Sequence, residues 1–267
     1  MSARYFTSDW HIGSSHILQY AKRPFKNPLD AYCSLKENCM HHLKDDHGNI
    51  VFHVGDFLLK NTDRHDKKLG PDVNDSDSLL TYEYCMLGLS NEYCRFVLLA
   101  GNHDDGHSCE TDIKTMTIDL NQNYRNVFVS HYPSTHKYYY GPMNHGNQLF
   151  RVNLCGHVHD KWLMHYDECC GVLNINVGVD VWNYRPVEDV ELTEMLDKVV
   201  RNAKHGIWLS EINCWTRADF DEANKTVEKK IVSDREKRKA ERYARKGLTP
   251  EECERRKQAA LKAKKNK

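Results

Sequence analysis

Short apolar runs rich in β-branched and aromatic residues alternate along this chain with stretches whose apolar residues recur every three or four positions. The first pattern predicts strands over residues 3–7, 50–54, 95–100, 127–129, 150–155, 173–177 and, less regularly, 206–212. The second predicts helices over residues 29–44, 79–89 and 192–204. Strands that alternate with helices are typical of an α/β fold with a mixed sheet.

Two regions depart from this pattern. Residues 60–78 are polar and rich in Asn and Asp, which predicts a long surface loop. From residue 219 the sequence is charged and helical, and Thr249-Pro250-Glu251-Glu252 has the cap, proline and glutamate of a second helix start. We therefore divide the chain into a domain over residues 1–216 and a basic helical tail over residues 217–267.

The net charge of zero conceals an asymmetry between these parts. The segment from Lys225 to Lys267 holds 17 Lys/Arg and 7 Asp/Glu of the 38 and 38 in the chain, which leaves 21 and 31 for residues 1–224. Such a tail could contact nucleic-acid phosphates, pair with an acidic surface, or form a solvated helix with internal charge pairs. The acidic residues interleaved with its basic ones favour the solvated helix.

The ten cysteines form no C-x-x-C pair. With no secretory leader, this pattern predicts reduced thiols and a cytoplasmic location. The adjacent Cys169 and Cys170 could be redox-active or bind metal, but we expect buried, inert side chains. No apolar run reaches the eighteen or so residues that a membrane span needs, so we expect no membrane association.

Polar residues of metal-ligand type form five clusters, and four of these follow an apolar run. The clusters are Asp9-Trp10-His11, Gly55-Asp56, Gly101-Asn102-His103-Asp104, Ser130-His131 and Gly156-His157-Val158-His159. Strand ends in an α/β fold can bring such residues into one pocket. We predict that Asp9 and His11 lie on an extended segment, which would point both side chains the same way, and that His157 and His159 repeat this arrangement.

Together the clusters describe a two-metal hydrolytic centre. Two cations about 3.5–4 Å apart can activate water and neutralise phosphoryl oxygens, and they need a bridging anion. Asp56 is the candidate bridge because a carboxylate has two oxygens to share. The mixed nitrogen and oxygen ligands suit Mn²⁺, Fe, Zn²⁺, Co²⁺ or Ni²⁺ better than Ca²⁺, with Mn²⁺ the leading candidate.

In this order the clusters resemble the D-x-H, G-D, G-N-H-[DE], G-H and G-H-x-H blocks of the calcineurin-like metallophosphoesterase superfamily, over residues 4–186. The resemblance implies a two-sheet β-sandwich flanked by helices, to which this chain adds a charged C-terminal helical extension. It also implies that His103 contacts the phosphate and protonates the leaving oxygen, while Asp104 orients His103. By the same resemblance one metal has the ligands Asp9, His11 and His159, the other has Asn102, His131 and His157, and Asp56 bridges them.

The segment from Asn176 to Pro186 further resembles the NVGVD…RP segment of a small bacterial and phage branch of that superfamily, and Arg23-Pro24-Phe25 fits the same branch. The long 60–78 loop and the basic tail depart from the branch. Both could reshape access to the site, so the resemblance does not supply the substrate.

Several other residues have two readings. Arg185 could bind a phosphate oxygen or form a salt bridge in its turn, and Trp10 could stack on a base, although we expect it to face away from Asp9 and His11. His136 and the Tyr138-Tyr139-Tyr140 run could line the substrate pocket or pack internally, and we expect His53 in the core or beside the metal ligands. We expect solvated side chains for His41, His42, His47, His65, His107, His145 and His205.

The sequence therefore predicts a cytoplasmic metallophosphoesterase, a hydrolase that acts on a phosphodiester of nucleotide type, including nucleic-acid ends and cyclic nucleotides. A phosphomonoesterase with the same centre is the nearest alternative. A calcineurin-like scaffold without catalysis, with the tail as its docking element, is a second alternative. A nucleic-acid-binding protein whose metal site is secondary is a third.

Overall fold

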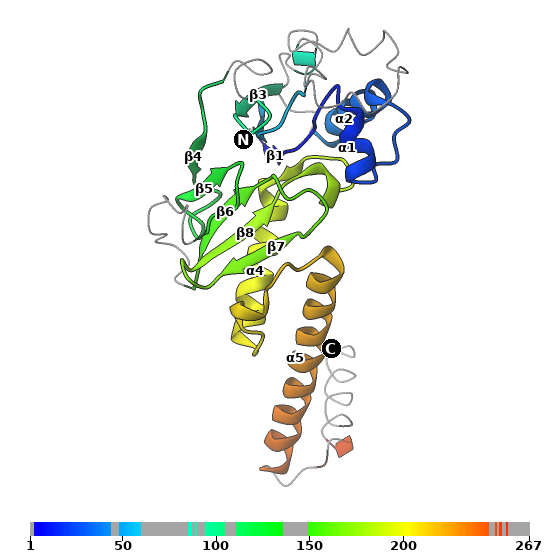
Figure 1. The fold of residues 1–267 in the computed structure, drawn as a ribbon. Coiled ribbons are helices and arrows are strands. Elements are labelled where there is room, and N and C mark those ends of the chain that lie inside the picture. Colours follow the sequence, from blue (N-terminus) through cyan, green and yellow to red (C-terminus); the bar gives the residue numbers. More distant parts are fainter. Residues whose placement is uncertain are drawn as a thin grey trace.

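Two mixed β-sheets form the centre of the molecule, and helices flank them (Figure 1). The first sheet has the order β3-β2-β1-β9, in which β1, β2 and β3 are parallel and β9 is antiparallel to β1. Its strands are β1 (Arg4–Thr7), β2 (Asn49–Val54), β3 (Cys94–Leu99) and β9 (Val187–Glu188). This computed structural model describes residues 3–43, 48–59, 85–86, 89, 94–104, 111–135, 149–245, 249, 251–252 and 255.

The second sheet has the order β4-β5-β6-β8-β7. Its three inner strands are parallel, and both edge strands are antiparallel to their neighbours. The strands are β4 (Thr115–Ile118), β5 (Val127–Ser130), β6 (Arg151–Cys155), β7 (Met164–Asp167) and β8 (Val172–Asn176). The α/β class predicted from the sequence is confirmed, with two mixed sheets and flanking helices.

Alternate residues of β1 separate two hydrophobic cores. Phe6 belongs to the larger core, which joins both sheets and includes Leu154 of β6 and Ile175 of β8. Its neighbour Tyr5 belongs to the second core, which contains Leu35 from α2 (Pro28–His42). This period of two is what a strand that is covered on both faces requires.

The helices show ordinary start signals. α2 has Pro28 in its first turn, and the side chain of Asn27 accepts a hydrogen bond from the Asp30 amide at 2.8 Å. α4 (Asp189–Lys204) buries Leu192, Met195, Leu196 and Val199, a spacing that places one apolar face on the larger core. The remaining helical segments are α1 (Ser15–Tyr20), α5 (Arg217–Ala244) and two 3-10 turns, η2 (Val179–Val181) and η3 (Leu209–Glu211).

The strand predicted over residues 206–212 is wrong. The segment contains η3 instead, because the Ile212 amide bonds locally to the carbonyl of Leu209 at 2.9 Å. Ile212 is buried in the larger core and Leu209 packs against it, whereas Trp208 is 71% exposed. The predicted 60–78 loop and most of the helix predicted over residues 79–89 lie outside the described residues.

α5 begins at Arg217, and its buried residues, among those described, lie in its first three turns. Phe220, Asn224 and Val227 are buried, and Phe220 is part of the larger core. Farther along, the helix extends away from the sheets (Figure 1). The second helix start is confirmed at Thr249, whose amide donates to Glu252 Oε2 at 2.9 Å while its hydroxyl accepts from the Glu252 amide at 3.3 Å.

The eight cysteines among the described residues are free thiols. Cys169 is exposed and Cys170 is half-buried, so the burial predicted for this pair is wrong. The pair lies in the tight turn between β7 and β8, where the amides of Cys170 and Gly171 bond back to Asp167 at 3.1 and 2.8 Å. Within the described part of the chain, no helix has the length and apolarity to cross a bilayer.

Candidate metal centre

The carboxyl ends of parallel strands bring the predicted ligands together. Asp9, Asp56 and Asn102 follow β1, β2 and β3, so they lie at one edge of the first sheet. His131 follows β5, and His157 and His159 follow β6, at the matching edge of the second sheet. Ser8 pairs in parallel with Gly178, and the His157 amide donates to Asp9 Oδ1 at 3.0 Å, so the two edges adjoin at the site.

Five of the seven predicted metal ligands have a left-handed backbone. The φ angles are 60° for Asp9, 48° for His11, 56° for Asp56, 69° for His157 and 51° for His159. The extended segment predicted for Asp9 and His11, and repeated for His157 and His159, is therefore wrong. Left-handed conformations are uncommon away from glycine, and they cluster at functional sites when the surrounding structure enforces them.

Backbone hydrogen bonds between two loops enforce this geometry. The amides of Asp9 and His11 donate to the carbonyls of Gly55 and Asp56 at 3.1 and 2.9 Å, which ties the loop after β1 to the loop after β2. Glycines allow the close approach: a Cβ on Gly101 would overlap the carboxylate of Asp56, and a Cβ on Gly156 would overlap the side chains of Ser8 and Asp9.

The carboxylate of Asp56 lies at the centre of the ligand set. Its Oδ2 is 3.2 Å from His131 Nε2 and 3.4 Å from His11 Nε2, and its Oδ1 accepts a hydrogen bond from the His103 amide at 2.9 Å. Asn102 Oδ1 lies 3.0 Å from His131 Nε2 and 2.9 Å from His157 Nδ1. Carboxylate and amide oxygens thus converge on imidazole nitrogens.

Three combinations of these side chains place their ligand atoms within 4.8 Å of one another and could hold a metal ion. Asp56 takes part in two of the three. The combinations are Asp9 with His11 and His159, His11 with Asp56 and His103, and Asp56 with His131 and His157.

The donor atoms are suited to a cation. His11 is 4% exposed, and neither of its ring nitrogens makes a hydrogen bond with the described residues. Burial, despite the opposing pull of Asp56, holds its pKa well below the ordinary value, so the ring is neutral with an available lone pair. A buried imidazole without a hydrogen bond is costly unless it has a ligand, and transition metals favour nitrogen donors.

Asp56 and His131 polarise each other. Burial would raise the pKa of Asp56, but the hydrogen bond and charge of His131 lower it below its ordinary range. Burial would conversely lower the pKa of His131, but its contact with Asp56 and the charge of Asp9 raise it to about 9. The negative charge of Asp56 is thus paired with a proton on His131.

Asp104 has a positioning contact that the sequence did not predict. Its carboxylate accepts hydrogen bonds from the amides of Asp56 at 2.7 Å, Gly101 at 2.8 Å and Phe57 at 3.1 Å, which joins the loops after β2 and β3. Its predicted orientation of His103 stays a prediction. His103 itself is exposed and lines a cavity of about 280 Å³ over the ligands.

Arg23 and Asp180 also support the site, and the sequence analysis gave them no role there. Asp180 Oδ2 lies 3.2 Å from His159 Nδ1, which leaves Nε2 of that ring for a ligand. Arg23 donates to both carboxylate oxygens of Asp180 at 2.8 and 2.9 Å and to the backbone carbonyls of Asp9 and Trp10. The signal in the sequence was the pair of branch-specific segments in which these residues lie.

For three residues the structure decides between the alternatives that the sequence left open. Trp10 is buried in the second core, and its indole donates to Thr7 Oγ1 at 2.8 Å, so it is not exposed to stack on a base. Arg185 forms the salt bridge, with Nη2 2.6 Å from Glu191 Oε1. His53 is fully buried beside Trp10, as expected of a core residue.

The surface histidines are mixed. His41 is exposed as expected, with 80% of its side chain accessible. His42 is half-buried between Arg185 and Glu191, so its predicted solvation is wrong, and His205 is half-buried as well. Four further histidines that were expected to be solvated lie outside the described residues: His47, His65, His107 and His145. His136 and Tyr138–Tyr140 also lie outside them.

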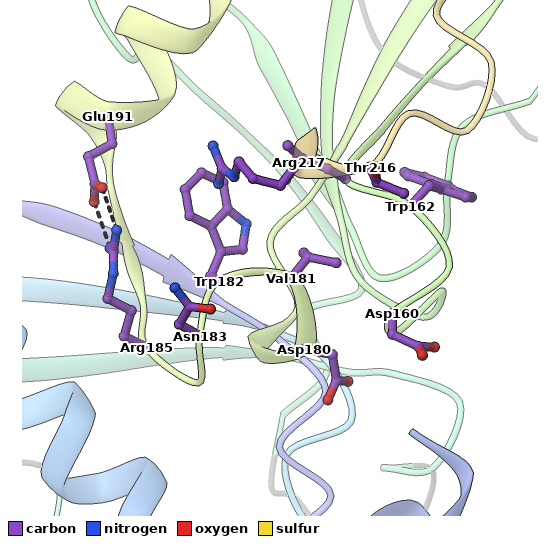
Figure 2. A pocket seen from close by; sticks show the side chains of 11 residues that line it. Asp160, Trp162, Asp180, Val181, Trp182, Asn183, Arg185, Glu191, Thr216 and Arg217 are labelled. Atoms are coloured by element: carbon purple, nitrogen blue, oxygen red, sulfur yellow. Dashed lines mark hydrogen bonds and ion pairs between the residues drawn. The ribbon is translucent and has the colours of Figure 1, made fainter. Parts of the chain in front are cut away.

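A second cavity of about 470 Å³ is lined by Asp160, Trp182 and Arg217, among others (Figure 2). Arg217 stacks on the ring of Trp182 at 4.3 Å in this cavity, and Asp160, Trp162 and Asp180 line its other side. The loop after β6 separates the two cavities, because His159 and Lys161 line the smaller one while Asp160 and Trp162 line the larger. The stacked Arg217 anchors the start of α5 on the domain.

No family model matches the chain, and no curated protein matches it. A crystal structure of a protein of unknown function from Aquifex aeolicus is similar to 73% of this chain and 100% of that chain, at 20% identity and a TM-score of 0.47. A likeness at this level says nothing about chemistry, so the function must be argued from the site.

Proposed function

We propose that this chain is a metal-dependent phosphoesterase of the calcineurin-like type, with a dinuclear centre. The observation that carries the proposal is the position of Asp56, whose Oδ2 lies within 3.4 Å of both His11 Nε2 and His131 Nε2. One carboxylate oxygen thus faces two separate groups of imidazoles, which suits a ligand shared between two ions.

The remaining ligands divide around Asp56 into two groups. Asp9, His11 and His159 would hold one ion, and Asn102, His131 and His157 would hold the other. Bound there, the ions would lower the pKa of water and stabilise charge on phosphoryl oxygens. Mn²⁺ is the first candidate, with Fe, Zn²⁺, Co²⁺ and Ni²⁺ as the others, because the donor set mixes imidazole nitrogens with oxygens.

The substrate then exchanges one bond to phosphorus for another. Water adds its oxygen to phosphorus and releases a proton to solvent, the ester P–O bond breaks, and the leaving oxygen takes a proton. We assign that proton to His103, which is exposed at the cavity, while Asp56 Oδ1 fixes its backbone amide. Asp104 holds the loop that carries His103 through its three backbone hydrogen bonds.

A nucleotide-type phosphodiester is the proposed substrate, and a phosphomonoester is the alternative. The described cavity contains the cation Lys161 and the aromatic Tyr20 beside the ligands, which suits a phosphate with an aromatic substituent. The non-catalytic scaffold is disfavoured because all seven ligands and His103 lie at the site. A scaffold would have no need of the left-handed backbone at five of them.

The decisive experiment is hydrolysis with added Mn²⁺ of bis-p-nitrophenyl phosphate, p-nitrophenyl phosphate, 2′,3′-cyclic nucleotides and single-stranded DNA and RNA. We expect diester turnover that falls by at least 100-fold in Asp56→Asn and His103→Ala, with circular dichroism unchanged. His41→Ala removes an exposed imidazole from α2 and serves as the matched control. Full turnover in Asp56→Asn, or no turnover of any substrate by folded, metal-loaded protein, would contradict the proposal.

A further inference from the structure

We propose that Tyr20 and Tyr132 are stacking platforms for two nucleobases, one on each side of the scissile phosphate, so that the enzyme acts on single-stranded nucleic acid. This inference rests on the proposed phosphodiesterase function and names the substrate class for that site. It starts from the exposed aromatic residues of the structure.

Three large aromatic side chains among the described residues are exposed: Tyr20 at 51%, Tyr132 at 50% and Trp208 at 71%. Two of the three contact proposed metal ligands. The ring of Tyr20 lies 5.6 Å from that of His159, and the ring of Tyr132 lies 4.7 Å from that of His157. Half-exposed rings at a site, rather than scattered over the surface, indicate a ligand with apolar faces.

Each tyrosine belongs to a different half of the centre. His159 is grouped with Asp9 and His11, whereas His157 is grouped with Asp56 and His131, whose ring is 5.3 Å from that of Tyr132. A phosphate held between the two groups has two ester arms. One arm then passes Tyr20 and the other passes Tyr132, so a substrate with an aromatic group on each arm uses both rings.

Both platforms have fixed backbones. Tyr20 ends α1, which begins at the side-chain cap of Ser14, and its ring also stacks on His16 at an interplanar angle of 18°. The carbonyl of Tyr132 accepts hydrogen bonds from Ser130 Oγ at 2.8 Å and Asn153 Nδ2 at 3.2 Å. Rigid aromatic residues bind at a small entropic cost, which suits stacking on bases of any sequence.

The chemistry favours a single strand over a duplex. Bases in a duplex already stack on their neighbours and offer no free face to a protein ring, whereas unpaired bases do. Lys161 lines the cavity over the ligands together with Tyr20, and it supplies a cation for a phosphate oxygen of the nucleic-acid backbone.

The test compares oligodeoxythymidylate hexamers with abasic hexamers of the same length, as Mn²⁺-dependent substrates. We expect the KM of the base-bearing hexamer to be at least about fivefold lower than that of the abasic hexamer. Tyr20→Leu and Tyr132→Leu should each reduce the ratio of the two KM values by about threefold or more. Tyr20→Phe and Tyr132→Phe keep the ring and should keep the ratio. Trp208→Leu removes the third exposed aromatic residue, away from the ligands, and is the matched control.

Equal KM values for the two hexamers would overturn the inference while leaving the phosphoesterase intact, provided that bis-p-nitrophenyl phosphate is hydrolysed. A ratio that the leucine variants do not change, or equal cleavage of a duplex, would overturn it as well. If the protein hydrolyses nothing, the proposed function fails. Fluorescence anisotropy of the two labelled hexamers then tests stacking by itself, with weaker binding of the base-bearing hexamer to the leucine variants as the supporting result.

Discussion

The guanidinium of Arg23 and the carboxylate of Asp180 form a buried ion pair 157 positions apart in the chain, with Nε 2.8 Å from Oδ1. The pair joins the loop after β1, through the carbonyls of Asp9 and Trp10, to the imidazole of His159. Burial raises the pKa of Asp180, but the contacts with His159 and Arg23 lower it below its ordinary value, so the carboxylate stays charged. One buried pair therefore positions ligands from both sheets.

Asp180→Asn should weaken metal binding and folding together. The variant removes a charge from a buried pair, which costs about 3–5 kcal/mol of unfolding free energy. It also frees the ring of His159, and the loss of such an orienting carboxylate lowers metal affinity by about 10–100-fold. Urea unfolding and Mn²⁺ titration calorimetry measure the two effects.

The control is Glu228→Gln, which breaks the more exposed pair with Arg201. That variant should cost at most about 1 kcal/mol and leave Mn²⁺ affinity unchanged. Unaltered Mn²⁺ affinity in Asp180→Asn would show that the carboxylate does not orient a ligand.

The number of bound metal ions should show whether the proposed ligands form two separate groups. His159→Ala and His157→Ala each remove a ligand from a different group, so each should lose one of the two ions. Asp56→Ala should lose both, because its carboxylate is the proposed shared ligand. Elemental analysis after gel filtration counts the bound ions, with His41→Ala as the control. Retention of two ions by Asp56→Ala would exclude a bridging role.

Gly101→Ala should damage the site without unfolding the sheets. The added methyl group would overlap the carboxylate and amide of Asp56, and overpacking of this kind costs about 1–3 kcal/mol. Displacement of Asp56 should lower Mn²⁺ affinity by about tenfold or more. Gly171→Ala, in the open β7–β8 turn at a φ of +66°, should cost about 1 kcal/mol of stability through backbone strain and leave Mn²⁺ affinity unchanged.

The ion pair between Arg185 and Glu191 predicts a pH dependence of stability. Burial would raise the pKa of Glu191, but hydrogen bonds from Arg185 and the Glu188 amide lower it from 4.5 to about 2. Because the pKa is lower in the folded state, the stabilisation is complete above pH 4.5 and is lost as the pH falls toward 2. Glu191→Gln should therefore cost about 1–2 kcal/mol at pH 7, after allowance for solvent screening, and less at pH 3.

Urea unfolding of both proteins at the two pH values measures that difference. A gap between wild type and Glu191→Gln that is equally large at pH 7 and pH 3 would mean that the charge of Glu191 contributes nothing.

The start of α5 should contribute more to stability than the rest of the tail. The last fully buried residue of α5 is Val227, so removal of residues 234–267 should change stability by no more than about 0.5 kcal/mol. Removal of residues 217–267 also exposes the contacts of Phe220 and Val227, which should cost about 3–6 kcal/mol. Thermal unfolding of the two truncations tests this. Nucleic-acid affinity whose salt dependence survives the removal of residues 234–267 would show that these residues are not the binding element.

The sequence predicted those strands whose apolar residues are buried on both faces, such as β2 and β6, because their runs are continuous. It did not predict β4, in which exposed and half-buried residues alternate, the mostly half-buried edge strand β7, or the two-residue β9. It failed at residues 206–212, where a 3-10 turn replaces the strand and Trp208 is exposed. In each of these segments, the burial of the side chains rather than their composition decided whether the strand prediction was right.

All nine predicted site residues lie together, because parallel strands end at a common edge and the clusters follow those strands. The sequence did not predict the backbone conformation of the ligands or the contacts that position them from distant parts of the chain. No local pattern marks Asp9 as left-handed, since that φ depends on hydrogen bonds to Gly55 in another loop. Likewise, the contact of Arg23 with Asp180 spans most of the chain.

The left-handed ligands also determine when an ion can be captured. An unfolded chain visits such backbone angles rarely, and visiting five of them together is a negligible event, so an ion cannot gather these ligands ahead of the sheets. In zinc fingers, by contrast, the ion organises the chain. For the proposed ions the order is reversed: the fold forms the site first, so the ion-free protein should already be folded and should bind or exchange ions reversibly.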